Sequence, residues 1–317
     1  MNKPEKILIT GAAGFIGSHL AERLLNLEYE VTGIDNFDEF YDPAIKRSNI
    51  KNCLDNSRFR FFEADIRNPE VMAKIITPDI SCVVHLAAKA GVRPSIENPL
   101  LYNDVNINGT MNILEALRSS KIRKLIFASS SSVYGNNRKV PFSESDNVDF
   151  PISPYAATKK AGELLCHTYH KLYNIDITGL RFFTVYGPRQ RPDLAIHKFS
   201  RLILDGRPIP VYGDGSMRRD FTYIDDIIDG IVNSIERCNG YNIYNLGESR
   251  PVSVNELITH IENALGTKAV RQQLPEQPGD VKCTYADVSK AVKELKYTPS
   301  TKIEDGLEKF AEWLRNA

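Results

Sequence analysis

Short apolar runs alternate with longer segments of helical periodicity through the first half of the chain. Between the first two runs, apolar residues recur every three or four positions and can lay one apolar stripe on a sheet. Those residues are Ile16, Leu20, Leu24 and Leu27. The alternation is typical of a parallel α/β sheet, in which a helix connects each strand to the next. It predicts strands at residues 7–10, 31–35, 59–64, 82–86, 124–129 and 175–181, and helices at 103–119 and 154–173.

The pattern changes after residue 181, where glycine and proline separate short segments and the strand–helix alternation becomes irregular. We therefore expect a doubly wound parallel (Rossmann) α/β domain over residues 1–181 and a smaller α/β lobe over residues 182–317, arranged around a shared cleft. A helical segment followed by a strand-like one, at residues 223–246, is expected to return to the sheet of the first domain.

The composition is that of an ordinary soluble globular protein. Among the 317 residues, 40 basic residues balance 40 acidic ones, so the net charge provides no general attraction to nucleic acid or to an anionic membrane. The apolar runs fall short of the ~18 residues of a membrane span. The run that follows Lys3 and Lys6 is too interrupted by glycines and charges for a signal peptide. The five scattered cysteines show no metal-ligand spacing, and we expect a reduced, cytoplasmic protein without a metal site.

A glycine-rich turn stands where the first predicted strand meets the first helix, with glycines at positions 11, 14 and 17. Such a turn suits a dinucleotide pyrophosphate, although a merely tight turn would use the same residues. Asp35 ends the next strand, where its carboxylate can accept hydrogen bonds from an adenosine ribose and would repel a 2′-phosphate. The pattern therefore favours NAD over NADP, the alternative being a plain turn aspartate ahead of Asn36.

Tyr155 and Lys159 are four residues apart and lie on one face of the helix predicted at 154–173. The lysine charge favours the ionised tyrosine and lowers the tyrosine pKa. Four serines at 129–132 follow the fifth strand, where a hydroxyl can hydrogen-bond a substrate alcohol or the carbonyl formed from it, the alternative being a polar loop. Together these features predict hydride chemistry on an alcohol with a nicotinamide cofactor. His85 is expected to pack in its strand without a catalytic role.

The motifs occur in the order GAAGFIG (11–17), Asp35, HLAA (85–88), ASSSSVYG (128–135) and YAATK (155–159). Over nearly the whole chain, this series resembles the extended short-chain dehydrogenase/reductases that act on nucleotide sugars. The resemblance implies that Tyr155 is the general base, that Lys159 holds the nicotinamide ribose, and that Ser130 assists Tyr155, with Ser129 and Ser131 as near alternatives. It implies NAD contacts at Gly11, Gly14, Phe15, Ile16, Gly17, Asp35, Asn36, Asp65, Ile66, Leu86, Ala87, Ala88, Lys89, Asn106, Tyr155 and Lys159.

Members of this family differ in the chemistry that comes after hydride abstraction. Nucleotide-sugar 4,6-dehydratases typically carry an Asp-Glu pair just before Val-Tyr-Gly, and UDP-glucuronate decarboxylases typically carry a glutamate there. This chain has Ser131 and Ser132 instead. Because elimination then has no carboxylic acid as its proton donor, the serines favour simple return of the hydride, which is epimerisation.

Three segments resemble the UDP-glucuronate 4-epimerases in particular, at residues 35–42, 85–95 and 183–193. A uronic acid carries one more negative charge than a neutral hexose, so its pocket should offer an arginine or hydroxyls near C6. We expect Thr184 and Arg191 to serve that carboxylate; for Arg191 a solvated loop or a diphosphate clamp is the alternative. The segment Gln277-Pro-Gly-Asp280 departs from the commoner Arg-Pro-Gly-Asp. The resemblance implies substrate contacts at Arg93, Ser130, Ser131, Ser132, Thr184, Arg191, Val211, Arg219 and Asp280, with Arg219 on the diphosphate.

The sequence therefore predicts an NAD-dependent enzyme of the UDP-glucuronate 4-epimerase type with a UDP-sugar as substrate. The first alternative is a related enzyme that acts on UDP-glucose, UDP-N-acetylglucosamine or a UDP-pentose, and a UDP-glucuronate decarboxylase comes next. A scaffold that binds NAD without turnover is a third, and the presence of both Tyr155 and Lys159 argues against it. The resemblance also implies a homodimer formed through helices of the cofactor domain.

Overall fold

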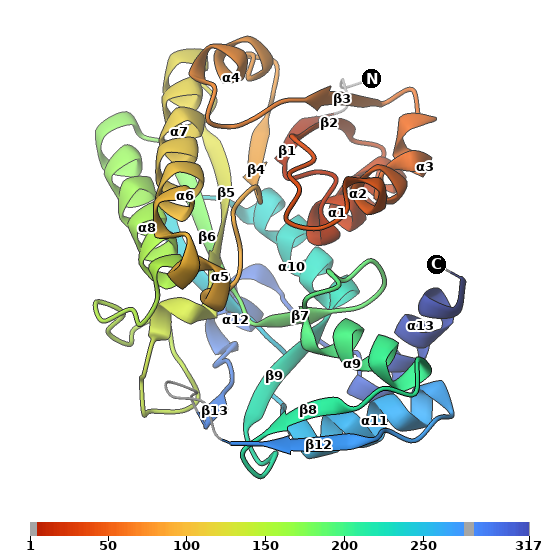
Figure 1. Cartoon of the computed structure of the whole chain (residues 1–317). Coiled ribbons are helices and arrows are strands. Elements are labelled where there is room, and N and C mark those ends of the chain that lie inside the picture. Colours follow the sequence, from red (N-terminus) through yellow and green to blue (C-terminus); the bar gives the residue numbers. More distant parts are fainter. Residues whose placement is uncertain (1–4, 276–281, 317) are drawn as a thin grey trace. The chain divides into compact units, whose positions relative to one another are not determined.

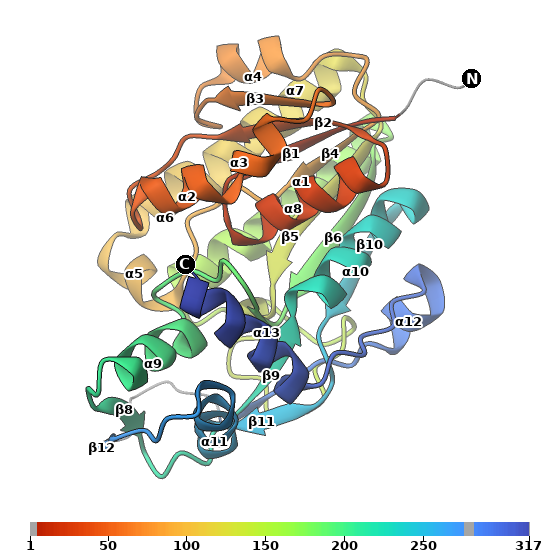
Figure 2. The same cartoon turned by 90° about the vertical axis from the view of Figure 1, so that its right-hand side faces the viewer.

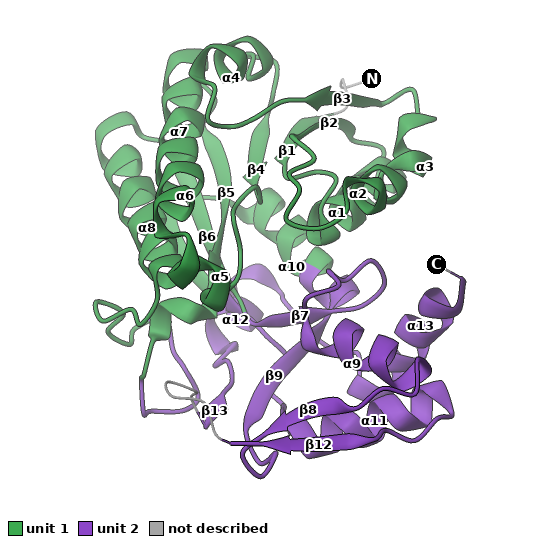
Figure 3. Cartoon of the chain, viewed as in Figure 1, with its two compact units in different colours: residues 1–136, 145–182, 228–244 green, residues 137–144, 183–227, 245–317 purple. Residues whose placement is uncertain are grey.

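The computed structural model describes residues 5–275 and 282–316 and divides into two compact units (Figure 3). Unit 1 comprises residues 1–136, 145–182 and 228–244, and unit 2 comprises residues 137–144, 183–227 and 245–317. Asp280 and Gln277 lie outside the described residues. Within the described ranges, no helix is both long enough and apolar enough to cross a membrane.

Unit 1 is built on a seven-stranded sheet with the strand order β10-β6-β5-β4-β1-β2-β3. Strands β1 to β6 pair in parallel. The strand order reverses at β1, so the loops that follow β1 and β4 diverge from each other, and this is where doubly wound sheets bind their ligands. The strands are β1 (Lys6–Thr10), β2 (Glu30–Asp35), β3 (Phe59–Glu63), β4 (Cys82–His85), β5 (Lys124–Ser130), β6 (Asp176–Phe182) and β10 (Tyr241–Leu246).

Helices cover both faces of this sheet (Figure 1 and Figure 2). Helices α4, α7 and α8 cover one face, and their apolar stripes meet β1, β4 and β5 in one buried cluster that includes Leu8, Val83, Leu114 and Cys166. Helices α1 and α10 lie on the other face. The helices of unit 1 are α1 (Phe15–Asn26), α2 (Pro43–Asn49), α3 (Lys51–Leu54), α4 (Pro69–Ile75), α5 (Val92–Glu97), α6 (Pro99–Asn103), η1 (Asp104–Asn108), α7 (Gly109–Ser120), η2 (Ser131–Tyr134), α8 (Pro154–Tyr173) and most of α10 (Ile224–Arg237).

Unit 2 contains two small sheets with helices packed on them. Strand β9 pairs antiparallel with β11 and parallel with β7 and β13, while β8 pairs with β12. Helix α11 begins with a capping box in which the Ser253 hydroxyl and the Glu256 carboxylate each accept a backbone N–H. The elements are β7 (Thr184–Tyr186), α9 (Ala195–Leu204), β8 (Ile209–Tyr212), β9 (Arg218–Tyr223), β11 (Pro251–Ser253), α11 (Val254–Leu265), β12 (Arg271–Leu274), β13 (Cys283–Thr284), α12 (Ser289–Leu295) and α13 (Ile303–Asn316).

The predicted fold class is confirmed, and the six predicted strands agree with β1 to β6 to within one residue at each end. The helix predicted at 154–173 coincides with α8. The helix predicted at 103–119 is only partly correct, because residues 104–108 form a π-helical turn, η1, between α6 and α7. Such π turns are rare, and they often occur at functional sites.

Candidate cofactor and catalytic site

The glycine-rich turn connects β1 to α1 with little room for side chains. Gly11 has φ +73°, and a Cβ on it would lie 2.8 Å from the Ala87 nitrogen. A Cβ on Gly17 would lie 2.1 Å from the Gly11 carbonyl oxygen. Glycine is therefore required at both positions, and the backbone runs close to the start of α1. The turn presents a helix N-terminus with a positive dipole end, which suits a pyrophosphate.

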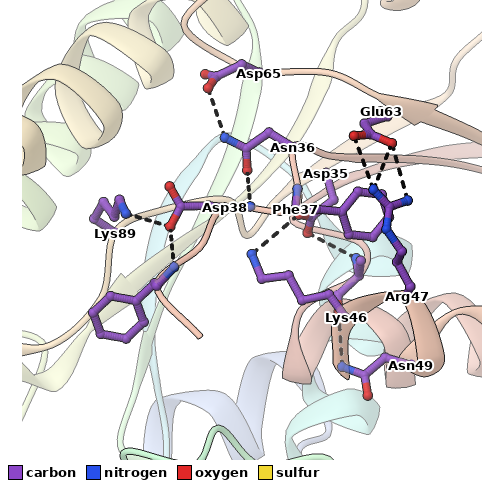
Figure 4. A network of polar contacts seen from close by, with 12 residues as sticks. Asp35, Asn36, Phe37, Asp38, Lys46, Arg47, Asn49, Glu63, Asp65 and Lys89 are labelled. Carbon is purple, nitrogen blue, oxygen red and sulfur yellow. Dashed lines mark hydrogen bonds and ion pairs between the residues drawn. The ribbon is translucent and has the colours of Figure 1, made fainter. Parts of the chain in front are cut away.

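Asp35, at the end of β2, is 7% exposed, and the protein already engages its carboxylate (Figure 4). One oxygen accepts from the Ala13 N–H at 3.1 Å, and the other accepts from the Phe37 N–H at 2.9 Å. The Lys46 ammonium lies 3.6 Å away. A carboxylate can accept about four hydrogen bonds, so Asp35 can still accept hydrogen bonds from ribose hydroxyls. These contacts fix the glycine-rich turn against the end of β2.

Polar pairs also connect the loops that follow β2, β3 and β4 (Figure 4). Asn36 donates to Asp65 at 2.9 Å, and hydrogen bonds from Arg67 lower the pKa of Asp65 to about 2. Lys89 donates to Asp38 at 2.6 Å, which joins the loop after β4 to the loop after β2. The other predicted cofactor residues of this region also belong to unit 1, at the start of α1 or in the loops after β3 and β4: Phe15, Ile16, Ile66, Leu86, Ala87 and Ala88.

Asn106 lies in η1 and is 3% exposed. Its amide oxygen accepts from the Lys89 N–H at 2.8 Å, and its amide nitrogen donates to the Lys89 carbonyl at 2.9 Å and to the Thr158 hydroxyl at 3.0 Å. The Thr158 hydroxyl in turn donates to the Tyr155 carbonyl at 2.8 Å. The side chain of Asn106 therefore joins the loop after β4 to the first turn of α8.

Tyr155 and Lys159 lie in the first two turns of α8, which starts at an N-cap formed by the Ser153 hydroxyl. The Tyr155 ring is half-buried and meets Tyr102 edge-on, with ring centroids 6.3 Å apart. Lys159 is 5% exposed, and its ammonium donates to the Ala128 carbonyl on β5 at 2.8 Å. Burial lowers the pKa of Lys159 to about 8. The helix thus places a desolvated cation one turn from a tyrosine.

The serine run divides into hydroxyls with different partners. Ser129 donates to the Glu163 carboxylate at 2.6 Å. Ser130 is the last residue of β5, and its hydroxyl accepts from the Ser132 N–H and donates to the Ser132 hydroxyl, both at 3.1 Å. It therefore serves as the N-cap of η2. Ser131 and Ser132, in the first turn of η2, are half-buried.

The predicted substrate residues divide between the units. Arg93 is exposed on α5 in unit 1, which also contains Ser130, Ser131 and Ser132, whereas the predicted residues described next belong to unit 2. Arg191 forms a bidentate ion pair with Asp193 at 2.9 and 2.7 Å, so a carboxylate of the chain already balances its charge. Thr184 begins β7, Val211 is buried in β8, and Arg219 lies in β9 and donates to the Arg218 carbonyl at 2.9 Å.

His85 is 2% exposed and takes part in a hydrogen-bonded chain. The Thr110 hydroxyl donates to the Asn106 carbonyl at 2.6 Å, so His85 Nε2 donates to Thr110 at 3.0 Å. Nδ1 is then the acceptor, and the Thr10 hydroxyl donates to it at 2.7 Å. Burial and the nearby Lys159 charge lower the pKa of His85 to about 3, which keeps the ring neutral. The histidine supports the loops of the site through hydrogen bonds.

Two residues that the sequence analysis did not single out lie directly behind the serines. Glu163 follows Lys159 by one turn of α8, and Arg181 stands opposite Ser129 in the register of β5 and β6. They form a buried ion pair, with Arg181 Nε 2.9 Å from a Glu163 oxygen. The spacing of Glu163 from Lys159 was the available signal, since positions i and i+4 share one helix face.

A family model described as GDP-mannose 4,6 dehydratase matches residues 8–310. The UDP-glucuronate 4-epimerase of Thermodesulfobacterium geofontis is 46% identical over 96% of this chain and 95% of its own length. The crystal structure of UDP-glucuronic acid 4-epimerase from Bacillus cereus, in complex with UDP-glucuronic acid and NAD, has a TM-score of 0.92 at 43% identity over 98% of this chain and 99% of that chain. The UDP-glucose 4-epimerase of Thermotoga maritima, with UDP-glucose, has a TM-score of 0.90 at 31% identity over 98% and 99%.

The family match, the site motifs and the full-length relatives agree, and this chain belongs to the GDP-mannose 4,6-dehydratase family of extended short-chain dehydrogenase/reductases.

Proposed function

We propose that this protein is an NAD-dependent 4-epimerase that interconverts UDP-glucuronate and UDP-galacturonate. The observation that carries the proposal is Tyr155 beside a desolvated Lys159 on α8, with a serine run in place of the acids that elimination needs. The relatives named as UDP-glucuronate 4-epimerases, 46% and 43% identical to this chain, support the same activity.

The residues present fit NAD. The turn has no room for a Cβ at Gly11 or Gly17. Its backbone therefore carries no side chain at these positions, which lets a pyrophosphate approach the start of α1. Asp35 would hold the adenosine ribose, and Lys159 the nicotinamide ribose. When bound, NAD supplies the acceptor of the C4 hydride and, on return, its donor.

The chain's own residues manage the proton and the position of the sugar. The Lys159 ammonium favours ionised Tyr155, which takes the proton of the sugar 4-hydroxyl. Ser130 hydrogen-bonds the same oxygen and stabilises it as it becomes a ketone. Ser131 and Ser132 contact the sugar but cannot protonate a leaving group as a carboxylic acid does. The 4-ketone therefore turns over and regains hydride on its opposite face.

The uronate adds one requirement, because a 4-keto uronic acid is a β-keto acid that loses carbon dioxide when its carboxylate stands perpendicular to the ketone. We assign Thr184 and Arg191 to holding that carboxylate near the ketone plane. Replacing either by alanine should raise KM for UDP-glucuronate and increase carbon dioxide release per turnover. Alanine variants with unchanged affinity, turnover and gas release would remove both residues from the uronate site.

Other substrate contacts are proposed on the basis of the family resemblance. Arg219 in β9 would bind the diphosphate, with Arg93, Val211 and Asp280 making further contacts to the UDP-sugar. The expected consequence is a raised KM in an Arg219→Ala variant for every UDP-sugar, with kcat less affected.

Product analysis tests the activity directly. Purified protein is incubated with UDP-glucuronate, and the nucleotide sugars are separated and identified. UDP-galacturonate supports the proposal, whereas a UDP-pentose with carbon dioxide identifies a decarboxylase. Tyr155→Phe is the matched control, since it removes only the hydroxyl and should abolish turnover while NAD content stays unchanged.

An epimerase of UDP-glucose is the second candidate, because the bidentate Asp193 contact leaves Arg191 less charge for a uronate. The fold alone does not separate the two sugars, since the Thermotoga enzyme has nearly the same TM-score as the Bacillus enzyme. Turnover of UDP-glucose without turnover of UDP-glucuronate would establish this alternative.

We also propose that the protein is a homodimer and works in the cytoplasm. Leu164 and Leu172 on α8 are 56% and 66% exposed, an apolar surface suited to a second copy of the chain. Light scattering of the wild type and of a Leu172→Asp variant tests the dimer. The five cysteines are free thiols, four of them buried, which suits a reducing compartment. Cell fractionation tests the location.

A further inference from the structure

A buried ion pair lies behind the serine run in unit 1. The side chains of Glu163 on α8 and Arg181 on β6 are 3% and 4% exposed. Arg181 donates from Nε and from a terminal nitrogen to the two oxygens of Glu163, each at 2.9 Å. This fork geometry fixes both side chains, because two parallel bonds between planar groups leave them little freedom.

The pair has two further hydroxyl partners, and both come from the Ser-Ser-Ser-Ser-Val-Tyr-Gly segment. Ser129 donates to Glu163 at 2.6 Å. The other terminal nitrogen of Arg181 donates to the Tyr134 hydroxyl at 3.0 Å, and the guanidinium lies 4.9 Å from the centre of the Tyr134 ring. The ion pair thus fastens both ends of the segment that contains Ser130, Ser131 and Ser132.

The same contacts connect this segment to the helix with the reacting groups. Glu163 follows Lys159 by one turn on the buried face of α8. Lys159 donates to the Ala128 carbonyl, next to Ser129. Helix α8 therefore meets the end of β5 at two successive residues, through Lys159 at Ala128 and through Glu163 at Ser129. Ser130 is the next residue along the strand.

The charge balance of the pair also bears on Lys159. A lone carboxylate one turn away would stabilise the charge of the buried ammonium, whereas Arg181 neutralises Glu163 where it lies. Hydrophobic residues of similar volume commonly replace a buried ion pair without loss of stability, so stability alone does not explain a charged pair here. A requirement for fixed geometry does explain the charged pair, because each polar group of the network has a hydrogen-bond partner within it. These groups are the side chains of Glu163, Arg181, Ser129 and Tyr134.

We propose that Glu163, Arg181 and Tyr134 are positioning residues. Their hydrogen-bond network holds Ser130 in a fixed position relative to Tyr155 and Lys159. The proposal gives the Val-Tyr-Gly tyrosine a role and assigns Ser129 to support, which leaves Ser130 for the substrate oxygen. It rests on the proposed epimerase function, in which Ser130 touches the reacting hydroxyl.

The sharpest test is Tyr134→Phe, which keeps the ring under Arg181 and removes one hydrogen bond. We expect kcat to fall about 10-fold with KM for the UDP-sugar and NAD content nearly unchanged, because a misplaced hydroxyl affects the transition state rather than ground-state binding. Glu163→Gln should lower kcat by about 100-fold and shift the pH profile, since it leaves the Arg181 charge unbalanced. Tyr29→Phe, half-buried at the opposite end of the sheet, is the matched control and should leave kcat unchanged.

Coupling within the network separates positioning from a merely structural role. If the groups act as one unit, Tyr134→Phe combined with Ser129→Ala should lose less than the product of the two single losses. Wild-type kcat in Tyr134→Phe and in Glu163→Gln would overturn the proposal. So would a fall in kcat matched by loss of thermal stability and of bound NAD.

The test is kept independent of the sugar assignment. Kinetics use whichever UDP-sugar the wild type converts, so failure with UDP-glucuronate alone refutes only the proposed substrate. If the wild type converts none, the readout is the ultraviolet absorbance of the Tyr155 tyrosinate. It is obtained for the wild type and for Tyr134→Phe by subtracting the spectrum of the same protein that also carries Tyr155→Phe. An apparent pKa of Tyr155 that is the same in the wild type and in Tyr134→Phe would then refute the positioning role.

Discussion

Replacing Lys159 by methionine tests the desolvation of the ammonium beside Tyr155. Lys159 is 5% exposed, and its charge contacts the Ala128 carbonyl at 2.8 Å. Burial lowers its pKa from 10.5 to about 8. The unfolded chain therefore keeps the proton between about pH 8 and pH 10.5 while the folded protein has released it. Because the unfolded state binds more protons in that window, the free energy of unfolding of the wild type rises with pH there.

The magnitude comes from the size of the shift. At about 1.4 kcal/mol per pKa unit, the buried charge lowers the free energy of unfolding by about 3 kcal/mol at neutral pH. The methionine side chain has similar length and no charge, so the penalty is absent from the variant. The free energy of unfolding of Lys159→Met, taken relative to that of the wild type, should therefore decrease by about 2.5 kcal/mol between pH 7 and pH 10. Loss of the hydrogen bond to Ala128 lowers the free energy of unfolding of the variant by a similar amount at every pH. It therefore does not change how the difference between the variant and the wild type depends on pH.

The assay is urea unfolding of NAD-free protein, followed by far-ultraviolet circular dichroism at a series of pH values. Lys171→Met is the control, since Lys171 is exposed on the same helix and its replacement should give a difference that is flat with pH. Lys159→Met should also be inactive at every pH. A difference between Lys159→Met and the wild type that stays constant from neutral to alkaline pH would refute the desolvation argument.

Three further substitutions have defined outcomes. Asp38→Asn breaks the 2.6 Å contact with Lys89 between two cofactor-edge loops and should speed NAD release about 10-fold, measured as NAD retained through gel filtration; unchanged retention would contradict the role. Gly17→Ala places a Cβ 2.1 Å from the Gly11 carbonyl oxygen and should abolish NAD binding in calorimetry. His85, with its pKa lowered to about 3, should reduce the free energy of unfolding by about 1.4 kcal/mol per unit as pH falls below 6.5, and His85→Asn should remove that slope in acid unfolding titrations.

The central strands of unit 1, β1, β2, β4, β5 and β6, were predictable because each is a short, largely apolar run that is buried on both faces, and the motifs at their ends indicated the fold class. The π-helical turn at 104–108 was not predictable, since its residues continue an ordinary helical pattern. The side chain in that turn, Asn106, bonds to Lys89 and to Thr158, which are 17 and 52 residues away. Contacts of that range belong to the folded chain, and local periodicity does not contain them.

The serine run likewise has one property that the sequence predicts and another that depends on contacts in the folded chain. The sequence placed four hydroxyls at the end of β5 and left the choice among Ser129, Ser130 and Ser131 open. The deciding facts are the parallel register, which sets Ser129 opposite Arg181, and the position of Glu163 one turn beyond Lys159. The buried Glu163 carboxylate, which is paired with Arg181, accepts the Ser129 hydroxyl and so withdraws it from substrate chemistry. Ser130 comes next in the strand, and its hydroxyl bonds to Ser132 instead of to that ion pair.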